Sequence, residues 1–240
     1  MEEYWWSAST AATRLSGSCG DPSVPCLSVP EQFRQLRPWI HHGWEMVLMA
    51  ALLQDHQSPL RREGVEAFVA AYADRCRQAL DAHGWSSSQL QELLERVRGE
   101  AVQGDRAQWL ARHRTFAGVP ERLRCLGEDG VDWAVLTTKG RAFTAELLAG
   151  FALKPALLFG HEDGTKPDVL LRLQQERPLI GFVEDRRPTL ETVLATPGLE
   201  ALPCYLADWG YLRLSDREAL PEGVSLLTLD RLATPLADWR

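Results

Sequence analysis

Residues 179–190 read LIGFVEDRRPTL, an apolar run that ends in two adjacent acids and then takes on a helical pattern. An apolar run of this length, bounded by turn residues, is typical of a strand buried on both faces of a parallel sheet. The arrangement recurs upstream in WAVLTTKG at 133–140 and in ALLFGHEDGTKPD at 156–168. Short apolar runs that alternate with helical segments predict βα units and therefore an α/β fold.

The rest of the second half, residues 115–240, continues this alternation. We expect strands at 133–136, 156–159, 179–183, 203–207 and 224–229, and helices at 120–126, 141–149, 167–175 and 189–195. Right-handed crossovers between parallel strands would build one doubly wound, Rossmann-like sheet with helices in a layer on each face. The carboxyl ends of all its strands would then meet at one edge, where ligands bind in such folds.

The first half, residues 1–114, has a helical pattern throughout. Apolar residues recur every three or four positions in 4–15, 33–53, 65–80 and 90–110, and segments rich in Gly, Ser and Pro separate these runs. No strand pattern interrupts them. We therefore expect two domains, an all-helical one at 1–114 and an α/β core at 115–240.

Composition favours a cytoplasmic protein that binds neither nucleic acid nor membranes. The net charge is −7 and no Lys/Arg cluster offers a surface for a phosphate backbone. The longest apolar run, 46–53, is too short to span a bilayer, and the acidic N-terminus does not have the pattern of a signal peptide. The scattered, odd-numbered cysteines fit reduced thiols: Cys19, Cys26, Cys76, Cys125 and Cys204.

Two of the strand-end motifs carry groups that suit an anion. Thr137 comes directly after a predicted strand, where its hydroxyl and the following N–H groups can donate to a phosphoryl oxygen; alternatively, Thr137 and Thr138 simply end the strand. Lys166 precedes Pro167 at a predicted helix start, where a cation opposes the helix dipole unless its ammonium reaches an anion. A solvated surface lysine is the alternative interpretation.

The third motif carries the adjacent acids Glu184 and Asp185. Carboxylates at the mouth of a parallel sheet suit Mg²⁺, which takes few protein ligands and keeps several waters. Alternatively, the pair is a charged loop, or Asp185 caps the helix expected near Pro188. Because the three motifs end consecutive strands, we expect them to lie together at one edge of the sheet.

The stretch from Gly118 to Tyr211 resembles the core of the haloacid dehalogenase-like (HAD) hydrolases, in particular the phosphoglycolate-phosphatase-like branch. GVPERLRCLGEDGVDWAVLTTKGRAF at 118–143 is similar to that branch's helix, second strand and Thr-Asn-Lys motif, with Thr138 where Asn is usual. GTKPDVLL at 164–171 resembles its Lys-Pro-x-Pro segment, GFVEDRRPTLE at 181–191 its acidic motif, and ADWGY at 207–211 its Trp-Gly-Tyr stretch. The helical first half is similar in kind to the cap of such enzymes.

The resemblance implies a Mg²⁺-dependent phosphatase that passes a phosphoryl group from a small phosphorylated metabolite to an aspartate and then to water. It implies that Thr137, Thr138 and Lys166 bind the phosphoryl group, with Thr137 and Lys166 catalytic, and that Asp185 and Glu184 hold the metal. Thr189 stands where the family usually has a further acid.

The family's Asp-x-Asp nucleophile motif, which ends its first core strand, is not found in the chain. We expect that the chain begins just after this motif, that the first core strand is therefore missing, and that the chain as given is inactive. A non-catalytic HAD-fold binding or regulatory protein is the alternative. A metal-independent dehalogenase is another, which the acidic pair disfavours.

One polar and aromatic cluster in the first half has two interpretations: Arg37, Trp39, His41, His42 and Trp44. These residues would line the cleft beneath a cap and select substrate, or the tryptophans would pack the helical core with Arg37, His41 and His42 at its margin. We expect the second arrangement, with Trp5 and Trp6 also in the core.

Overall fold

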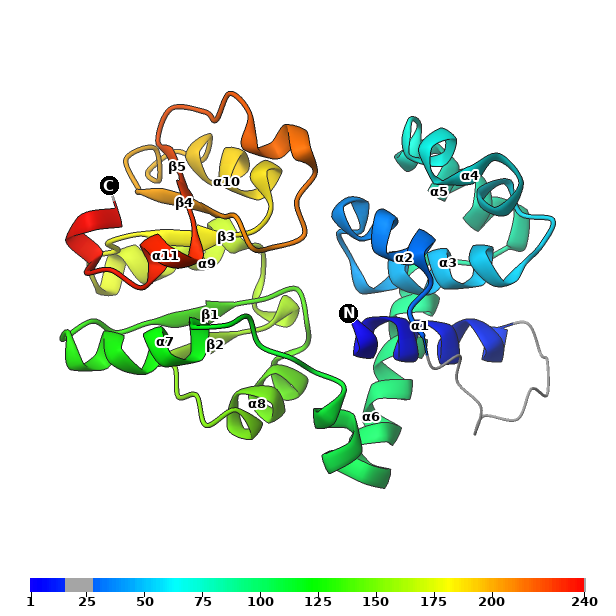
Figure 1. Cartoon of the computed structure of the whole chain (residues 1–240), viewed down its shortest axis with the longest axis horizontal. Coiled ribbons are helices and arrows are strands. Elements are labelled where there is room, and N and C mark those ends of the chain that lie inside the picture. Colours follow the sequence, from blue (N-terminus) through cyan, green and yellow to red (C-terminus); the bar gives the residue numbers. More distant parts are fainter. Residues whose placement is uncertain (16–27, 240) are drawn as a thin grey trace. The chain divides into compact units, whose positions relative to one another are not determined.

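The computed structural model describes residues 1–15 and 28–239, so Cys19 and Cys26 lie outside the described residues. The chain divides into two compact units, Met1–Arg114 and Thr115–Arg240 (Figure 1). The regular elements described in the first unit are all helical, and every described strand belongs to the second. None of the described helices is both long enough and apolar enough to cross a membrane.

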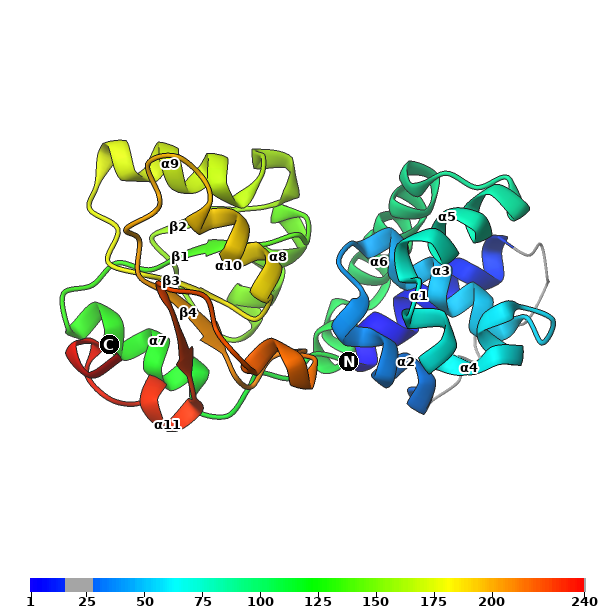
Figure 2. The same ribbon diagram turned by 90° about the horizontal axis from the view of Figure 1, so that it is seen from above.

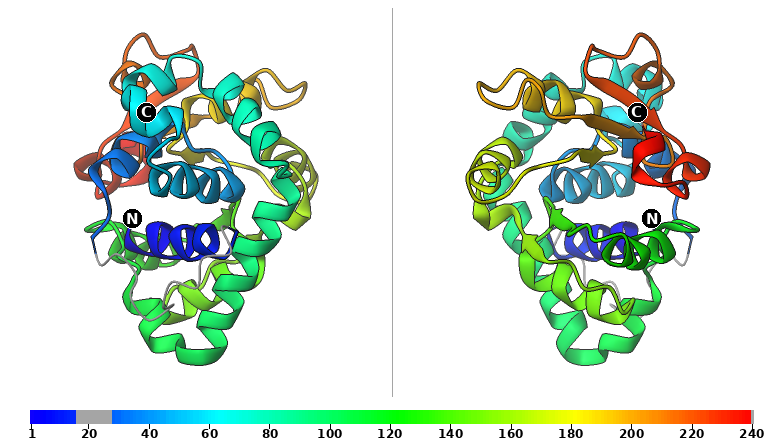
Figure 3. Two further views of the ribbon diagram at one scale, coloured as in Figure 1. Left: turned by 90° about the vertical axis from the view of Figure 1, so that its right-hand side faces the viewer. Right: turned by 90° about the vertical axis from the view of Figure 1, so that its left-hand side faces the viewer.

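Three helices form the core of the first unit: α1 (Glu2–Leu15), α3 (Gly43–Gln54) and α6 (Ser87–Ala111). α1 and α3 run side by side and α6 crosses beside them (Figures 2 and 3). α3 is apolar on nearly all sides, and most of its residues are buried because α2 (Glu31–Leu36), α4 (Pro59–Val69) and α5 (Tyr72–His83) also pack on it.

Three expected helices of the first unit are interrupted, among them 90–110, which has a kink within α6 at Asp105, where φ is −151°. The run 33–53 is interrupted by the 3₁₀ turn η1 (Arg37–Trp39), which holds Pro38, a residue without the N–H that a continuing helix needs. α3 then begins anew after His42, whose backbone N–H donates to Glu45 Oε2 at 2.6 Å. The run 65–80 is divided between α4 and α5 at Ala71, where φ is −134°.

The second unit contains two parallel sheets. β1 (Ala134–Leu136) pairs with β2 (Leu157–Phe159), and β3 (Phe182–Glu184) pairs with β4 (Cys204–Ala207), which pairs with β5 (Val224–Leu227). The helices of this unit are α7 (Val119–Glu128), α8 (Arg141–Gly150), α9 (Lys166–Glu176), α10 (Arg187–Leu194) and α11 (Leu229–Leu232). The 3₁₀ turns are η2 (His161–Asp163), η3 (Leu214–Arg217) and η4 (Leu236–Trp239).

This arrangement confirms an α/β fold with parallel strands and corrects the expected single sheet. The expectation is wrong because β1 and β3 are not hydrogen bonded to each other, so the sheet is divided between them. All five strands are also shorter than expected. β1, β2 and β4 each begin one residue later. The run 179–183 becomes a strand only from Phe182, and the run 224–229 ends as a strand at Leu227 before α11 begins.

β4, the central strand of the sheet β3-β4-β5, is buried on both faces. Successive residues of β4 point to opposite faces, so Cys204 and Leu206 join a cluster with Leu190 of α10, while Tyr205 packs with Trp239. The other sheet is less covered, since the three residues of β2 are only half-buried. The burial of the unit is therefore concentrated around β3-β4-β5.

Candidate functional site

The carboxyl ends of the strands lie at one edge, and contacts between their loops fix this arrangement. Thr137, directly after β1, donates its N–H to Phe159 O of β2 at 3.0 Å. Arg141, at the start of α8, donates its N–H to Glu162 Oε1 in the loop after β2 at 3.1 Å. The segment after β2 in turn reaches the end of β3 through the ion pair of Lys166 with Glu184.

Lys166 occupies the first position of α9 and forms an ion pair with Glu184, the last residue of β3. Thr165 caps the helix, with its hydroxyl accepting the N–H of Asp168 at 3.4 Å. The side chains of Lys166 and Glu184 are only 19% and 7% exposed. The interpretation of Lys166 as a solvated surface lysine is therefore wrong.

Glu184 lies in an environment that disfavours a negative charge. Burial raises the pKa of the Glu184 carboxyl, the Lys166 ammonium counteracts this, and the neighbouring Asp185 carboxyl raises the pKa further. The net pKa is raised. The repulsion between two adjacent carboxyls beside a single ammonium would be relieved by a further cation at this position.

Asp185 is held by the loop that follows β4. Its Oδ2 accepts the N–H of Tyr211 at 3.2 Å. Gly210 passes so closely that a Cβ there would lie 2.1 Å from Asp185 Cβ, so only glycine fits. Asp185 does not cap α10, because the residue at the N-cap is Arg186. The capping interpretation of Asp185 is therefore wrong.

Thr137 and Thr138 lie at the carboxyl end of β1, in the sheet β1-β2, without a described contact to Lys166, Glu184 or Asp185. Thr137 Oγ1 accepts the N–H of Lys139 at 3.1 Å, which leaves the hydroxyl proton available to donate. Thr138 is exposed. The structure thus joins Lys166, Glu184 and Asp185 through direct contacts and places the two threonines at the end of β1, in the other sheet.

Sequence reasoning missed one ion pair at this edge. The Arg141 guanidinium contacts the Asp163 carboxylate, and this hydrogen bond, together with one from the Gly160 N–H, lowers the pKa of Asp163. The pair ties the start of α8 to the loop after β2. Nothing in the spacing of the two residues signals it, since the contact depends on the parallel pairing of β1 and β2.

The acidic pair fits part of a magnesium site. In the described part of the chain, no group of three or more His, Cys, Asp or Glu side chains gathers as a ready-made metal site. Mg²⁺ is usually held by only one or two carboxylates, with water and substrate phosphate as its other ligands. Glu184 and Asp185 supply two adjacent carboxyls next to an ammonium, so the residues present fit this pattern.

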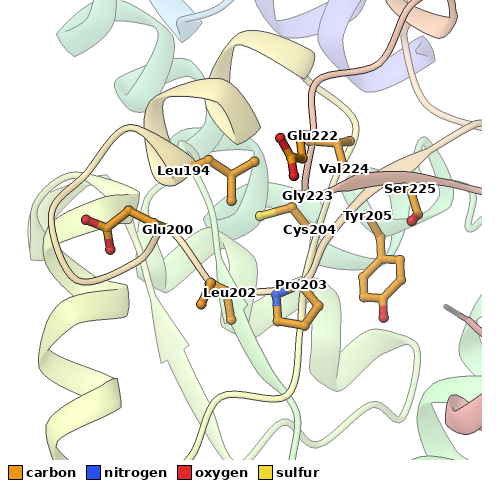
Figure 4. A pocket seen from close by; sticks show the side chains of 11 residues that line it. Leu194, Glu200, Leu202, Pro203, Cys204, Tyr205, Glu222, Gly223, Val224 and Ser225 are labelled. Carbon is orange, nitrogen blue, oxygen red and sulfur yellow. The ribbon is translucent and has the colours of Figure 1, made fainter.

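A hollow of about 630 Å³ lies elsewhere, at the amino ends of β4 and β5 (Figure 4). Its lining includes Pro203, Gly223 and Val224, with Glu200 and Glu222 as its charged side chains. It contains no basic side chain and lies at the opposite edge of the sheet from Glu184. The hollow is therefore unsuited to bind a phosphate and is separate from the candidate site.

The chain was compared with known protein families, curated proteins and solved structures. No protein-family model, curated protein or solved structure matches the chain.

In the first unit, the tryptophans pack as expected. Trp5 is 5% exposed, and Trp6, Trp39 and Trp44 pack against the same helical core. Arg37 lies 5.0 Å over the ring of Tyr4 and donates to Ile40 O, while the exposed His42 stacks on Trp44. His41 is half-buried near Tyr72, with ring centroids 6.4 Å apart.

Proposed function

We propose that the carboxyl edge of the second unit is the phosphoryl- and Mg²⁺-binding part of a HAD-like phosphatase. In this proposal, residues 115–240 form its Rossmann-like core and residues 1–114 its helical cap. The observation that carries the proposal is the contact of Lys166 with Glu184, next to Asp185, at the end of a parallel strand. Cationic and acidic groups in contact there suit a phosphoryl group and a metal bound side by side.

The Lys166–Glu184 ion pair would change partners when ligands bind. With Glu184 and Asp185 engaged by a cation, the Lys166 ammonium turns to a phosphoryl oxygen, for which it supplies a compact positive charge. The Thr137 hydroxyl, whose proton is available, donates to the same group. When bound, Mg²⁺ would supply Lewis-acid stabilisation of negative charge on the phosphoryl oxygens.

The attacking carboxylate that such a reaction needs is not among the described residues of this edge. Asp163 is held by Arg141, and Asp208 is held by Arg217 at 2.8 Å. We therefore propose that this chain binds Mg²⁺ and small phosphorylated molecules but does not hydrolyse them by itself. A non-catalytic binding protein with the same site is the second candidate, favoured by this missing carboxylate.

Calorimetric titration with MgCl₂ and with inorganic phosphate tests the proposal. Asp185→Asn should weaken Mg²⁺ binding at least about tenfold, because each lost carboxylate removes a charged ligand. Lys166→Met should weaken phosphate binding, because it removes the compact positive charge proposed to contact the phosphoryl oxygen. The matched control is Asp132→Asn. Asp132 is an exposed residue that precedes β1 at the opposite edge of the unit, so its substitution should change neither the Mg²⁺ affinity nor the phosphate affinity.

Two results would contradict the proposal. Equal Mg²⁺ affinity in Asp185→Asn and the unsubstituted chain would show that Asp185 does not bind the metal. Hydrolysis of p-nitrophenyl phosphate by this chain, abolished in Lys166→Met, would show that the chain contains its own nucleophile.

A further inference from the structure

We propose that a hollow beside α7 in the second unit binds a small organic carboxylate, which the guanidinium of Arg122 holds through two parallel hydrogen bonds. The ligand class is a monocarboxylate with a short, branched apolar body. This site is separate from the proposed phosphoryl site, since its lining does not include Lys166, Glu184 or Asp185. Its test needs neither Mg²⁺ nor phosphate.

The hollow has a volume of about 420 Å³, a size that suits a small organic molecule. It lies where α7 and α11, which pack against each other (Figure 2), come to their ends. One wall comes from α7 and the turn after it, and the other from the segment that follows α11. The lining consists of Arg122, Asp129, Val131, Ala233, Pro235 and Leu236. Apart from the arginine and the aspartate, these side chains are apolar.

Arg122 is held by one of the three nitrogens of its guanidinium. Nη1 donates to Asp129 Oδ2 at 2.8 Å, and the guanidinium carbon lies 5.9 Å from the ring centre of Trp239. The side chain of Arg122 is only 9% exposed, whereas that of Asp129 is 47% exposed. The cation is therefore buried, while water screens much of the charge of its carboxylate partner.

The other edge of this guanidinium has no acceptor. Nε and Nη2 of Arg122 are shielded from solvent and have no hydrogen-bond partner among the described residues. In the planar guanidinium these two nitrogens form one edge, and their N–H groups run parallel. Leaving donors of a buried charged group unpaired is costly, and such donors indicate a bound water, ion or ligand.

A carboxylate supplies what this edge lacks. Its two oxygens accept two parallel N–H groups of one arginine edge, which is a strong and geometrically specific form of ion pair. A single water would have to share one oxygen between both N–H groups, and it would bring no charge to balance the buried cation. The carboxylate reaches Nε and Nη2 from the hollow once a side chain in the wall shifts.

The lining defines the rest of the ligand. Val131, Ala233, Pro235 and Leu236 offer apolar surface, which favours an aliphatic body over a second charged group. Because the ligand would contact both α7 and the segment after α11, binding would hold these two parts together. Bound ligand would therefore raise the stability of the second unit.

NMR titration with sodium isovalerate tests the site, with the Nε–H resonance of Arg122 as the readout. This resonance should shift and saturate with a dissociation constant of about 1–10 mM. The uncharged control, isovaleramide, should bind at least about tenfold more weakly, because it offers only one acceptor oxygen. A shift that does not saturate, or that sodium chloride at the same ionic strength reproduces, would refute the proposal, as would equal binding of the amide.

Variants on both sides of the ion pair complete the test, followed through the amide resonances of Val131 and Leu236. Arg122→Met should abolish isovalerate binding, whereas the matched control Arg124→Met should not, since Arg124 lies on the same helix but is exposed. Asp129→Asn keeps an oxygen for Nη1 and removes a negative charge, so isovalerate should bind at least about threefold more tightly. Unchanged affinity in Arg122→Met, or no gain in Asp129→Asn, would contradict the proposal.

Discussion

Replacing Arg98 by methionine should destabilise the first unit by about 3–5 kcal/mol, because it removes the guanidinium that pairs with the buried Glu3 carboxylate. The His113 ring, whose Nε2 lies 3.6 Å from Glu3 Oε2, stays beside the carboxylate in the variant. Arg98 of α6 forms two parallel hydrogen bonds to Glu3 of α1, from Nε at 2.7 Å and from Nη2 at 3.1 Å. The side chains are 4% and 2% exposed, so water cannot replace the lost partner. Methionine keeps much of the volume, which limits the cavity left behind.

The magnitude has an independent estimate. If Glu3 takes up a proton instead of staying charged, the cost at pH 7 is about 1.36 kcal/mol for each unit between pH 7 and the ordinary glutamate pKa of about 4.3, or about 3.7 kcal/mol. At pH 5 the same sum gives about 1 kcal/mol. The penalty should therefore shrink as the pH falls from 7 to 5.

Urea unfolding at pH 7 and pH 5, followed by far-UV circular dichroism, measures the change. Hydrogen-exchange mass spectrometry of α1 peptides assigns the transition to the first unit. The matched control is Arg14→Met, since Arg14 and Glu100 join the same two helices at 2.6 Å but are 39% and 49% exposed. Breaking this exposed pair should cost at most about 1 kcal/mol.

Two results would refute this reasoning. One is a cost for Arg98→Met no larger than that for Arg14→Met. The other is a cost that does not decrease at pH 5. The double variant Glu3→Leu/Arg98→Met should regain most of the lost stability, because it buries no charge.

Three further predictions concern single residues. Gly99 lies within α6 with open space where a Cβ would be. Gly99→Ala should therefore raise the free energy of unfolding of the first unit by up to about 1 kcal/mol, which is measured as a higher urea midpoint. Burial raises the pKa of the Cys76 thiol to about 12, so iodoacetamide at pH 8 should label the exposed Cys125 well before Cys76, as read by peptide mass mapping. Burial would raise the pKa of Asp216, but hydrogen bonds from Arg213 outweigh it and lower the pKa. The ionised Asp216 carboxylate thus contributes its full stabilisation above about pH 4, and this stabilisation is lost as the pH falls through the pKa of the folded state. The free energy of unfolding of Asp216→Asn should therefore decrease less on acidification than that of the unsubstituted chain.

The strand ends were predictable because each carries a local signal. An apolar run that is followed by a polar residue, as at Thr137 and Glu184, indicates the end of a buried strand whichever strands pair with it. The sequence also placed Lys166 at the start of a helix. Its pairing with Glu184 was not predictable, because the contact joins the loop after β2 to the end of β3, and these strands belong to different sheets.

Strand pairing was the main error. The run AVL of β1 has the same composition whether one neighbour or two flank it, so its sequence does not reveal that β2 is its only partner among the described residues. The break within 33–53 did have a signal in Pro38, which the apolar periodicity obscured. The break at Ala71 had none, since alanine favours helix and tertiary packing decides the geometry there.

In the described part of the chain β1 pairs only with β2 and β3 only with β4, and the edge that this leaves on each strand affects how the chain behaves at high concentration. An edge strand with free backbone groups is a template for strands of other molecules, which leads to aggregation. Two features oppose this: each strand has only three residues, and the net charge of −7 keeps molecules apart. Because salt screens the charge but not the edges, the solubility of this chain depends on ionic strength more than that of a protein with closed sheets.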